Sequence, residues 1–304
     1  MSLTIGVTGA SGLIGRSLTS ALRERGDHVV VFVRRAPSAP DERGWDPAAE
    51  RLDPTALSDV DVVVNLAGKG IGDRRWNTEH KTEVLRSRVS ATRTVCAAIA
   101  ANERPIRLVN ASAVGFYGDR GDEVLTEESP PGVGFLPELV GAWEGAAAGL
   151  LDDGRSVVFA RTGLVMTAGG GALRPLVRAT KLGVGGPLGS GRQFWPIISM
   201  RDQVGALIHL IDRPDITGPV NLVGVEPPRQ REVASTLAKQ LKRPSVLPAP
   251  RLGLRLVVGQ FADDILASQR VLPARLQSSG FVHRDNTLSA VLTSVFHEAV
   301  TSAG

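Results

Sequence analysis

The sequence predicts an α/β fold, a Rossmann-type doubly wound parallel sheet with a smaller C-terminal substrate domain. Two observations lead to this fold class. A short apolar run at Leu3 to Thr8 leads through a glycine-rich stretch directly into a helical apolar pattern. Further apolar runs then alternate with helical patterns along the first half of the chain. These runs are apolar almost throughout, which is typical of strands covered by helices on both faces.

The glycine-rich stretch is VTGASGLIG, residues 7–15. Gly9 permits a tight turn, Gly12 allows the backbone to approach a pyrophosphate, and Gly15 lets the following helix pack close to the strand. The free N–H groups at the start of that helix favour a bound phosphate. A second apolar run at His28 to Val33 completes the strand–turn–helix–strand context of a dinucleotide site. We therefore expect a cofactor at this turn.

The end of the second strand predicts which cofactor is bound. An NAD site usually carries Asp or Glu at this point, but Arg34 and Arg35 stand here and no acid follows until Asp41. Two guanidinium groups suit a 2′-phosphate. The sequence therefore predicts NADP(H). The alternative is that both arginines are simply exposed on a loop.

Composition excludes several classes of protein. The 304 residues are 42% apolar and 22% charged, enough for one large unit or two unequal domains. The single Cys96 allows no internal disulfide, and we expect it to be a buried structural thiol. Without a bilayer-spanning apolar run or a signal-type N-terminus, we expect a cytoplasmic protein with no membrane partner.

The charges and histidines also limit the partners. The net charge is +4, but the basic residues are scattered, which argues against a nucleic-acid partner and suits small phosphate-bearing ligands. The five histidines show no ligand spacing, so we expect no metal site.

The remaining patterns place the other elements and the domains. Strands are expected at Val60–Leu66, Ile106–Ala111 and Val157–Arg161. Helices are expected at Thr78–Asn102, Pro137–Leu151, Leu176–Leu182, Arg201–Ile211, Arg229–Leu241, Leu254–Val258, Ile265–Gln269 and Leu288–Val300. We assign residues 1–165, with 196–225 returning to them, to an NADP-binding domain. Residues 166–195 and 226–304 then form the substrate or cap domain.

Four motifs together resemble the extended short-chain dehydrogenases/reductases. They are the glycine-rich turn, Asn65-Leu66-Ala67-Gly68, the strand ending at Ser112 and continuing to Phe116-Tyr117-Gly118, and Arg161-Thr162-Gly163. Finer features resemble one atypical branch, whose members carry names such as epimerase family protein or cell-division inhibitor-like nucleoside-diphosphate-sugar epimerase. These features are Arg74-Arg75-Trp76, the glycine-rich segment 185–193 and Gln269-Arg270-Val271-Leu272-Pro273. The resemblance covers essentially the whole chain.

The resemblance implies roles for individual residues. Cofactor contacts are expected at Gly9, Ser11, Gly12, Leu13, Ile14, Arg34, Arg35, Leu66, Ala67 and Gly68. Glu83 and Arg88 resemble ribose and phosphate contacts, Ser112 is expected near the nicotinamide, and the backbone of Val165 near its carboxamide. Arg192 and Gln193 are expected to bind substrate. As alternatives, Glu83 and Arg88 form a helix-surface pair, and Arg192 lies on a surface loop.

The catalytic pair of the superfamily is missing. That chemistry uses a Tyr and a Lys four residues later, on one face of a helix. Tyr117 is the only tyrosine, Gly121 stands four residues after it, and no lysine occurs between Lys81 and Lys181. Tyr117 could act as a lone acid with Ser112 as a hydrogen-bonding group, but packing is the alternative role for this tyrosine.

Two functions follow from these observations. The first is an NADP(H)-dependent oxidoreductase or epimerase-like enzyme acting on a sugar nucleotide or other small carbonyl compound, with Tyr117 or a carboxyl group such as Glu127 replacing the missing pair. The second is a non-enzymatic NADP(H)-binding sensor or regulatory protein. The sequence leaves both open, and it does not predict the oligomeric state.

Overall fold

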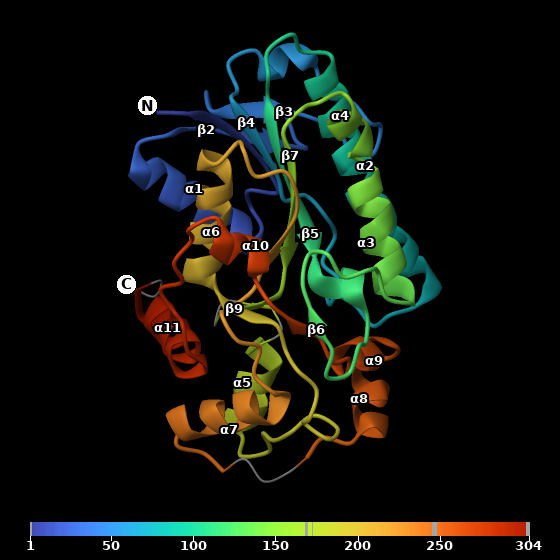
Figure 1. The fold of residues 1–304 in the computed structure, drawn as a ribbon, viewed down its shortest axis with the longest axis vertical. Helices are drawn as coiled ribbons and strands as arrows, with labels where there is room; N and C mark the ends of the chain where they lie inside the picture. The colour runs from blue at the N-terminus through green and yellow to red at the C-terminus, as the bar shows by residue number, and fades with distance from the viewer. Residues whose placement is uncertain (1, 168–169, 172, 245–247, 302–304) are drawn as a thin grey trace.

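The computed structural model describes residues 2–167, 170–171, 173–244 and 248–301. Its centre is a seven-stranded sheet in the order β10-β7-β5-β4-β1-β2-β3 (Figure 1), with every neighbouring pair parallel. The strands are β1 (Thr4–Thr8), β2 (His28–Val33), β3 (Glu42–Gly44), β4 (Val62–Asn65), β5 (Arg107–Ala113), β7 (Val157–Thr162) and β10 (Gly218–Leu222). The predicted fold class is confirmed.

Helices cover both faces of this sheet (Figure 1). On one face, α1 (Leu13–Arg25) and α6 (Met200–Asp212) pack on alternate strand residues such as Val62 and Val64. On the other face, α2 (Thr78–Ala100) and α4 (Ala148–Asp152) pack on the intervening residues such as Val63. Helix α3 (Phe135–Gly145) lies beside α2. The nearly continuous apolar strands follow from burial of both faces.

A second cluster of elements lies in the lower half of Figure 1. Its buried core joins β8 (Leu164–Met166) and β9 (Ile197–Ser199) to α5 (Leu173–Lys181), α7 (Gln230–Gln240) and α11 (Leu288–Thr301). The remaining elements are β6 (Val124–Leu125), which pairs with β11 (Arg270–Val271), and helices α8 (Arg251–Val258), α9 (Phe261–Ile265) and α10 (Ala274–Ser278). Within the described ranges, no helix is long and apolar enough to cross a bilayer.

Two expected helices differ from the structure. The expected helix at Pro137–Leu151 is two helices, because the chain turns at Ala147 to bury both Ala147 and Leu150 against the sheet. The expected helix at Ile265–Gln269 is wrong. Helix α9 ends at Ile265, and the following residues instead bond to the chain after β5, Ser268 N–H to Asp119 Oδ1 at 3.0 Å and Gln269 Nε2 to Gly118 O at 3.1 Å.

Candidate cofactor and substrate site

The glycine-rich turn forms a close-packed cradle at the start of α1. Gly9 has φ +67°, and a Cβ atom on it would lie 2.7 Å from the carbonyl group of Leu66. A Cβ atom on Gly15 would lie 2.2 Å from the Gly9 carbonyl oxygen, so α1 approaches the turn as closely as glycine permits. Gly12 stands at the N-cap, where no side chain of the described chain caps the helix. This open helix N-terminus fits a pyrophosphate group.

Three further predicted contacts lie around this turn. Ser11 is exposed and Ile14 is half-buried in α1. Leu13 meets the second half of the chain, because a Cβ atom on Gly171 would lie 3.8 Å from Leu13 Cδ2 and 3.5 Å from the Val165 carbonyl oxygen. The structure therefore brings Leu13 and Val165 to one neighbourhood.

The two arginines after β2 have different surroundings. Arg35 donates to both carboxylate oxygens of Glu42 on β3, at 2.8 and 2.5 Å, and to Ser38 Oγ at 2.8 Å. The hydrogen bonds that Arg35 and then Ser38 donate to the Glu42 carboxylate lower the pKa of Glu42 to about 2. Arg34 is exposed and its side chain has no hydrogen-bond or ion-pair partner among the described residues, so its guanidinium is the one left available to a 2′-phosphate. Glu42 was not among the predicted site residues, although an acid seven residues after Arg35 was the available signal.

The loop after β4 lies over a buried arginine. The N–H groups of Leu66 and Ala67 lie within 3.3 Å of Thr8 Oγ1, and a Cβ atom on Gly68 would lie 3.2 Å from Arg88 Cγ. The loop therefore runs directly above the Arg88 side chain.

Arg88 is 8% exposed, and its guanidinium lies 5.0 Å from the centre of the Trp143 ring. Its Nη1 donates to the carbonyl oxygens of Lys69 and Val84, while its buried Nε has no partner in the described chain. Burial lowers the pKa of Arg88 to about 10. A buried cation without a bonded carboxylate fits an anionic or oxygen-rich ligand group under this loop.

Glu83 occupies a separate position on α2. Its carboxylate accepts from Lys69 Nζ, and this hydrogen bond lowers the pKa of Glu83. Glu83 and Arg88 therefore do not form the helix-surface pair considered as an alternative, since each has other contacts.

Ser112 and Tyr117 belong to one buried network of polar side chains. Ser112 Oγ donates to Glu144 Oε1 at 2.5 Å, and Glu144 accepts from Arg161 at two atoms, both at 2.8 Å. Arg161 in turn donates to the Tyr117 oxygen at 3.0 Å, and Tyr117 donates to Asn221 Oδ1 at 2.8 Å. Tyr117 is 0% exposed, and burial raises the pKa of its hydroxyl. Its oxygen is thus enclosed by protein partners.

Two other predicted residues, Glu127 and Gln193, also have structural partners, and Arg192 is exposed. Glu127 is buried, accepts from the backbone N–H of Asn221 at 2.9 Å, and has its pKa raised by burial. Gln193 is buried and donates to Leu188 O at 3.0 Å, while Arg192 is exposed on the adjoining segment. Neither Arg192 nor Gln193 lines the pocket described next.

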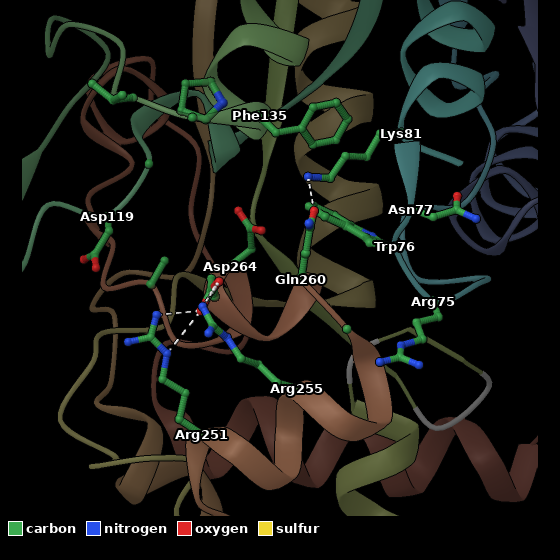
Figure 2. Close-up of a pocket in the computed structure, with 17 residues that line it drawn as sticks. Arg75, Trp76, Asn77, Lys81, Asp119, Phe135, Arg251, Arg255, Gln260 and Asp264 are labelled. Carbon is green, nitrogen blue, oxygen red and sulfur yellow. Dashed lines mark hydrogen bonds and ion pairs between the residues drawn. The ribbon is translucent and has the colours of Figure 1, made fainter. Parts of the chain in front are cut away.

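A pocket of about 940 Å³ lies between the sheet domain and the C-terminal helices (Figure 2). One wall comes from residues 75–81 at the start of α2, residues 118–119 after β5 and residues 133–137 at the start of α3. The opposite wall comes from α8, α9 and the residues up to 267. Trp76, Phe135 and Lys81 come from one wall and Gln260 and Asp264 from the other, and Lys81 Nζ donates to Gln260 Oε1 at 2.7 Å (Figure 2). The pocket was not predicted from the sequence, although Arg75 and Trp76 of the Arg74-Arg75-Trp76 motif line it.

Two family models match the chain. Residues 5–140 match the NAD dependent epimerase/dehydratase family. Residues 249–295, which include the α8–α9 wall of the pocket, match a domain of unknown function, DUF1731.

Individual proteins match over nearly the full length. Epimerase family protein Mb2239 of Mycobacterium bovis is 41% identical over 289 residues, covering 95% of this chain and 96% of its own. The human epimerase family protein SDR39U1, solved with NADPH, is 32% identical with a TM-score of 0.88, covering 97% of this chain and 99% of its own. MoeE5, solved with UDP-glucose and NAD, is 25% identical with a TM-score of 0.79, covering 99% of this chain and 100% of its own. The chain belongs to the NAD dependent epimerase/dehydratase family, together with SDR39U1 and the mycobacterial epimerase family proteins.

Proposed function

We propose that this chain binds NADP(H) and is an NADP(H)-dependent oxidoreductase or epimerase-like enzyme acting on a small carbonyl compound or a nucleotide sugar. The observation that carries the proposal is the uncapped N-terminus of α1 on a turn that only glycine fits. Arg34, which has no side-chain partner within the described chain, follows the neighbouring strand β2. Two similar proteins support it, since human SDR39U1 was solved with NADPH and MoeE5 with UDP-glucose and NAD.

The residues that would hold the cofactor follow the carboxyl edge of the sheet. The turn from Gly9 to Ile14 would hold the pyrophosphate, and Arg34 the 2′-phosphate. The loop Leu66–Gly68 with Arg88 beneath it would hold the adenosine half. When bound, NADPH supplies hydride. Ser112, near the end of β5, and Val165, in β8, would flank the nicotinamide half.

A second candidate function is supported by a different observation. The chain lacks the Tyr-x-x-x-Lys pair, and the hydroxyl of its single tyrosine is buried between Arg161 and Asn221. A protein that binds NADP(H) without turning it over, as a sensor or regulatory subunit, would need no such pair.

Two measurements in sequence separate these candidates. NADPH binding is measured first by isothermal titration calorimetry, with Arg34→Ala as the matched variant of weaker expected affinity. The protein is then incubated with NADPH and a panel containing UDP-glucose, UDP-glucuronic acid and small aldehydes, while absorbance at the nicotinamide band is followed. Turnover of any panel member supports the enzyme. Tight binding with no turnover supports the sensor, and no binding at all overturns both.

A further inference from the structure

Ser112 stands at the carboxyl edge of the sheet, beside the loop proposed to hold the adenosine half of the cofactor. Strand β5 lies between β4 and β7, and its Asn110 pairs with Asn65 on β4. Two residues beyond this pair, β5 reaches Ser112 and the chain after β4 reaches Ala67. On its other side Ser112 pairs with Arg161 on β7. Doubly wound folds bind their ligands along this edge.

The Ser112 hydroxyl has one hydrogen-bond partner among the described residues, the carboxylate of Glu144. Ser112 Oγ donates to Glu144 Oε1 at 2.5 Å. Glu144 lies in the last turn of α3, and the ring of its neighbour Trp143 has its centre 5.0 Å from the Arg88 guanidinium. The end of α3 therefore contacts both Arg88 and Ser112, two residues that the proposed function places at the cofactor.

Arg161 fixes the Glu144 carboxylate. Its Nε donates to Glu144 Oε1 and its Nη2 to Oε2, both at 2.8 Å, and the side chains of Arg161 and Glu144 are only 5% and 12% exposed. The guanidinium lies 3.6 Å from the ring centre of Phe116, and its Nη1 donates to the Tyr117 oxygen at 3.0 Å. A two-point pair of this kind holds the carboxylate in one orientation.

The direction of these hydrogen bonds determines what Ser112 can offer to a ligand. A guanidinium group only donates and a carboxylate only accepts, so the single hydroxyl proton of Ser112 is directed to Glu144. The Ser112 oxygen can then only accept, and no N–H or O–H group of the described residues donates to it. A buried acceptor without a donor suits a ligand that brings an N–H or O–H group.

We propose that Glu144 and Arg161 are a positioning pair that holds Ser112 as a hydrogen-bond acceptor for the nicotinamide half of the cofactor. This role rests on the proposed NADP(H) binding. The ribose hydroxyls and the carboxamide N–H groups of that half are the donors that Ser112 accepts from. A carbonyl oxygen brings no donor, so this arrangement disfavours Ser112 as the group that polarises a substrate carbonyl.

Binding measurements with two ligands test the positioning pair. Calorimetry compares NADPH with adenosine 2′,5′-bisphosphate, which carries the 2′-phosphate but lacks the nicotinamide half. Ser112→Ala and Glu144→Gln should each raise the Kd of NADPH roughly 3- to 10-fold, as for loss of one hydrogen bond. In Glu144→Gln the new amide can donate to Ser112 Oγ and occupy the acceptor that the cofactor needs. Both variants should change the Kd of the bisphosphate by less than about twofold.

The matched control is Glu138→Gln, the same substitution at an exposed position in the first turn of α3. It should leave the Kd of both ligands unchanged. Ser112→Ala removes one oxygen atom only, so this variant decides the question if the loss of the Glu144 charge unfolds the protein.

A double-mutant cycle tests whether Glu144 acts through Ser112. Glu144→Gln added to Ser112→Ala should raise the Kd of NADPH by less than about twofold more, because the hydroxyl that Glu144 positions is already absent. A third ligand, ADP-ribose 2′-phosphate, keeps the second ribose but lacks nicotinamide. A loss of affinity for this ligand in Ser112→Ala identifies the ribose hydroxyls as donors, whereas a loss confined to NADPH identifies the carboxamide.

Three results overturn the positioning role. They are an unchanged Kd of NADPH in Ser112→Ala, equal losses for NADPH and the bisphosphate, and a full additional loss when Glu144→Gln is added to Ser112→Ala. All three leave the proposed NADP(H) binding intact. A wild-type protein that binds neither NADPH nor the bisphosphate would instead overturn the proposed function, and the positioning role with it.

Discussion

Replacing Gly15 by alanine tests the packing of the phosphate cradle. The added Cβ atom would lie 2.2 Å from Gly9 O and 2.8 Å from Ala10 Cα, whereas ordinary contact begins at 3.4 Å. Both neighbours are backbone atoms, so α1 or the turn must move by about 1 Å. Such overpacking typically costs about 1–3 kcal/mol of unfolding free energy. At roughly 2–4 °C per kcal/mol, the Tm should fall by about 2–12 °C.

The same displacement should weaken NADPH binding. Hydrogen bonds from the N–H groups at the start of α1 lose strength when the donors move by about 1 Å, so we expect at least a roughly tenfold rise in Kd. Calorimetric unfolding and NADPH titration measure the two effects. The matched control is Gly141→Ala in α3, where an added Cβ meets nothing within 4 Å and the Tm should stay or rise. An unchanged Tm and Kd in Gly15→Ala would refute the account of the cradle.

Three further predictions concern single side chains. Arg34→Ala should reduce the preference for NADPH over NADH by roughly 10- to 150-fold, as for loss of a charge-assisted hydrogen bond, whereas Arg35→Ala should change it less than about threefold because Arg35 bonds Glu42. Titrations of each variant with NADPH and with NADH measure this preference, and equal losses in Arg34→Ala and Arg35→Ala would contradict the prediction. Tyr117→Phe should lower the unfolding free energy by about 1–3 kcal/mol in urea, since Asn221 and Arg161 lose a buried partner. Abolished turnover per folded molecule would instead indicate a direct chemical role. Burial raises the pKa of Glu127 in the folded protein. The neutral carboxyl group therefore contributes stability that is fully present below the pKa of an unfolded glutamate. This contribution is lost as the pH rises through the folded-state pKa, because Glu127 then becomes charged while buried. Glu127→Gln should therefore gain stability relative to wild type between pH 4 and 8, and a constant difference would exclude this effect.

Sequence patterns predicted the fold and the cofactor turn because both depend on local features. The continuous apolar strands and the glycines at 9, 12 and 15 determine the layers and the close packing of α1. Strand β3 was missed because Glu42-Arg43-Gly44 is short and polar. Glu42 lies on β3 and accepts hydrogen bonds from Arg35. Without β3, the sequence therefore does not show which of the two arginines has a protein partner.

The pocket could not be predicted from the sequence for a different reason. Its walls come from four separate segments, 75–81, 118–119, 133–137 and 251–267, which meet only when the C-terminal helices pack against the sheet domain. The pattern around Asp264 is that of an ordinary short helix. Asp263 and Asp264 both line the pocket, and only the structure shows that Asp263 is paired with two arginines.

The most direct test of the central claim is titration of the wild-type protein with NADPH and with NADH under identical conditions. The open α1 N-terminus predicts saturable binding of both cofactors. Arg34, whose side chain has no partner in the part of the chain that the structure describes, predicts NADPH binding at least about tenfold tighter through one charge-assisted contact to the 2′-phosphate. Equal affinity for the two cofactors would contradict the assignment of Arg34. No measurable binding of either would contradict the cofactor site itself.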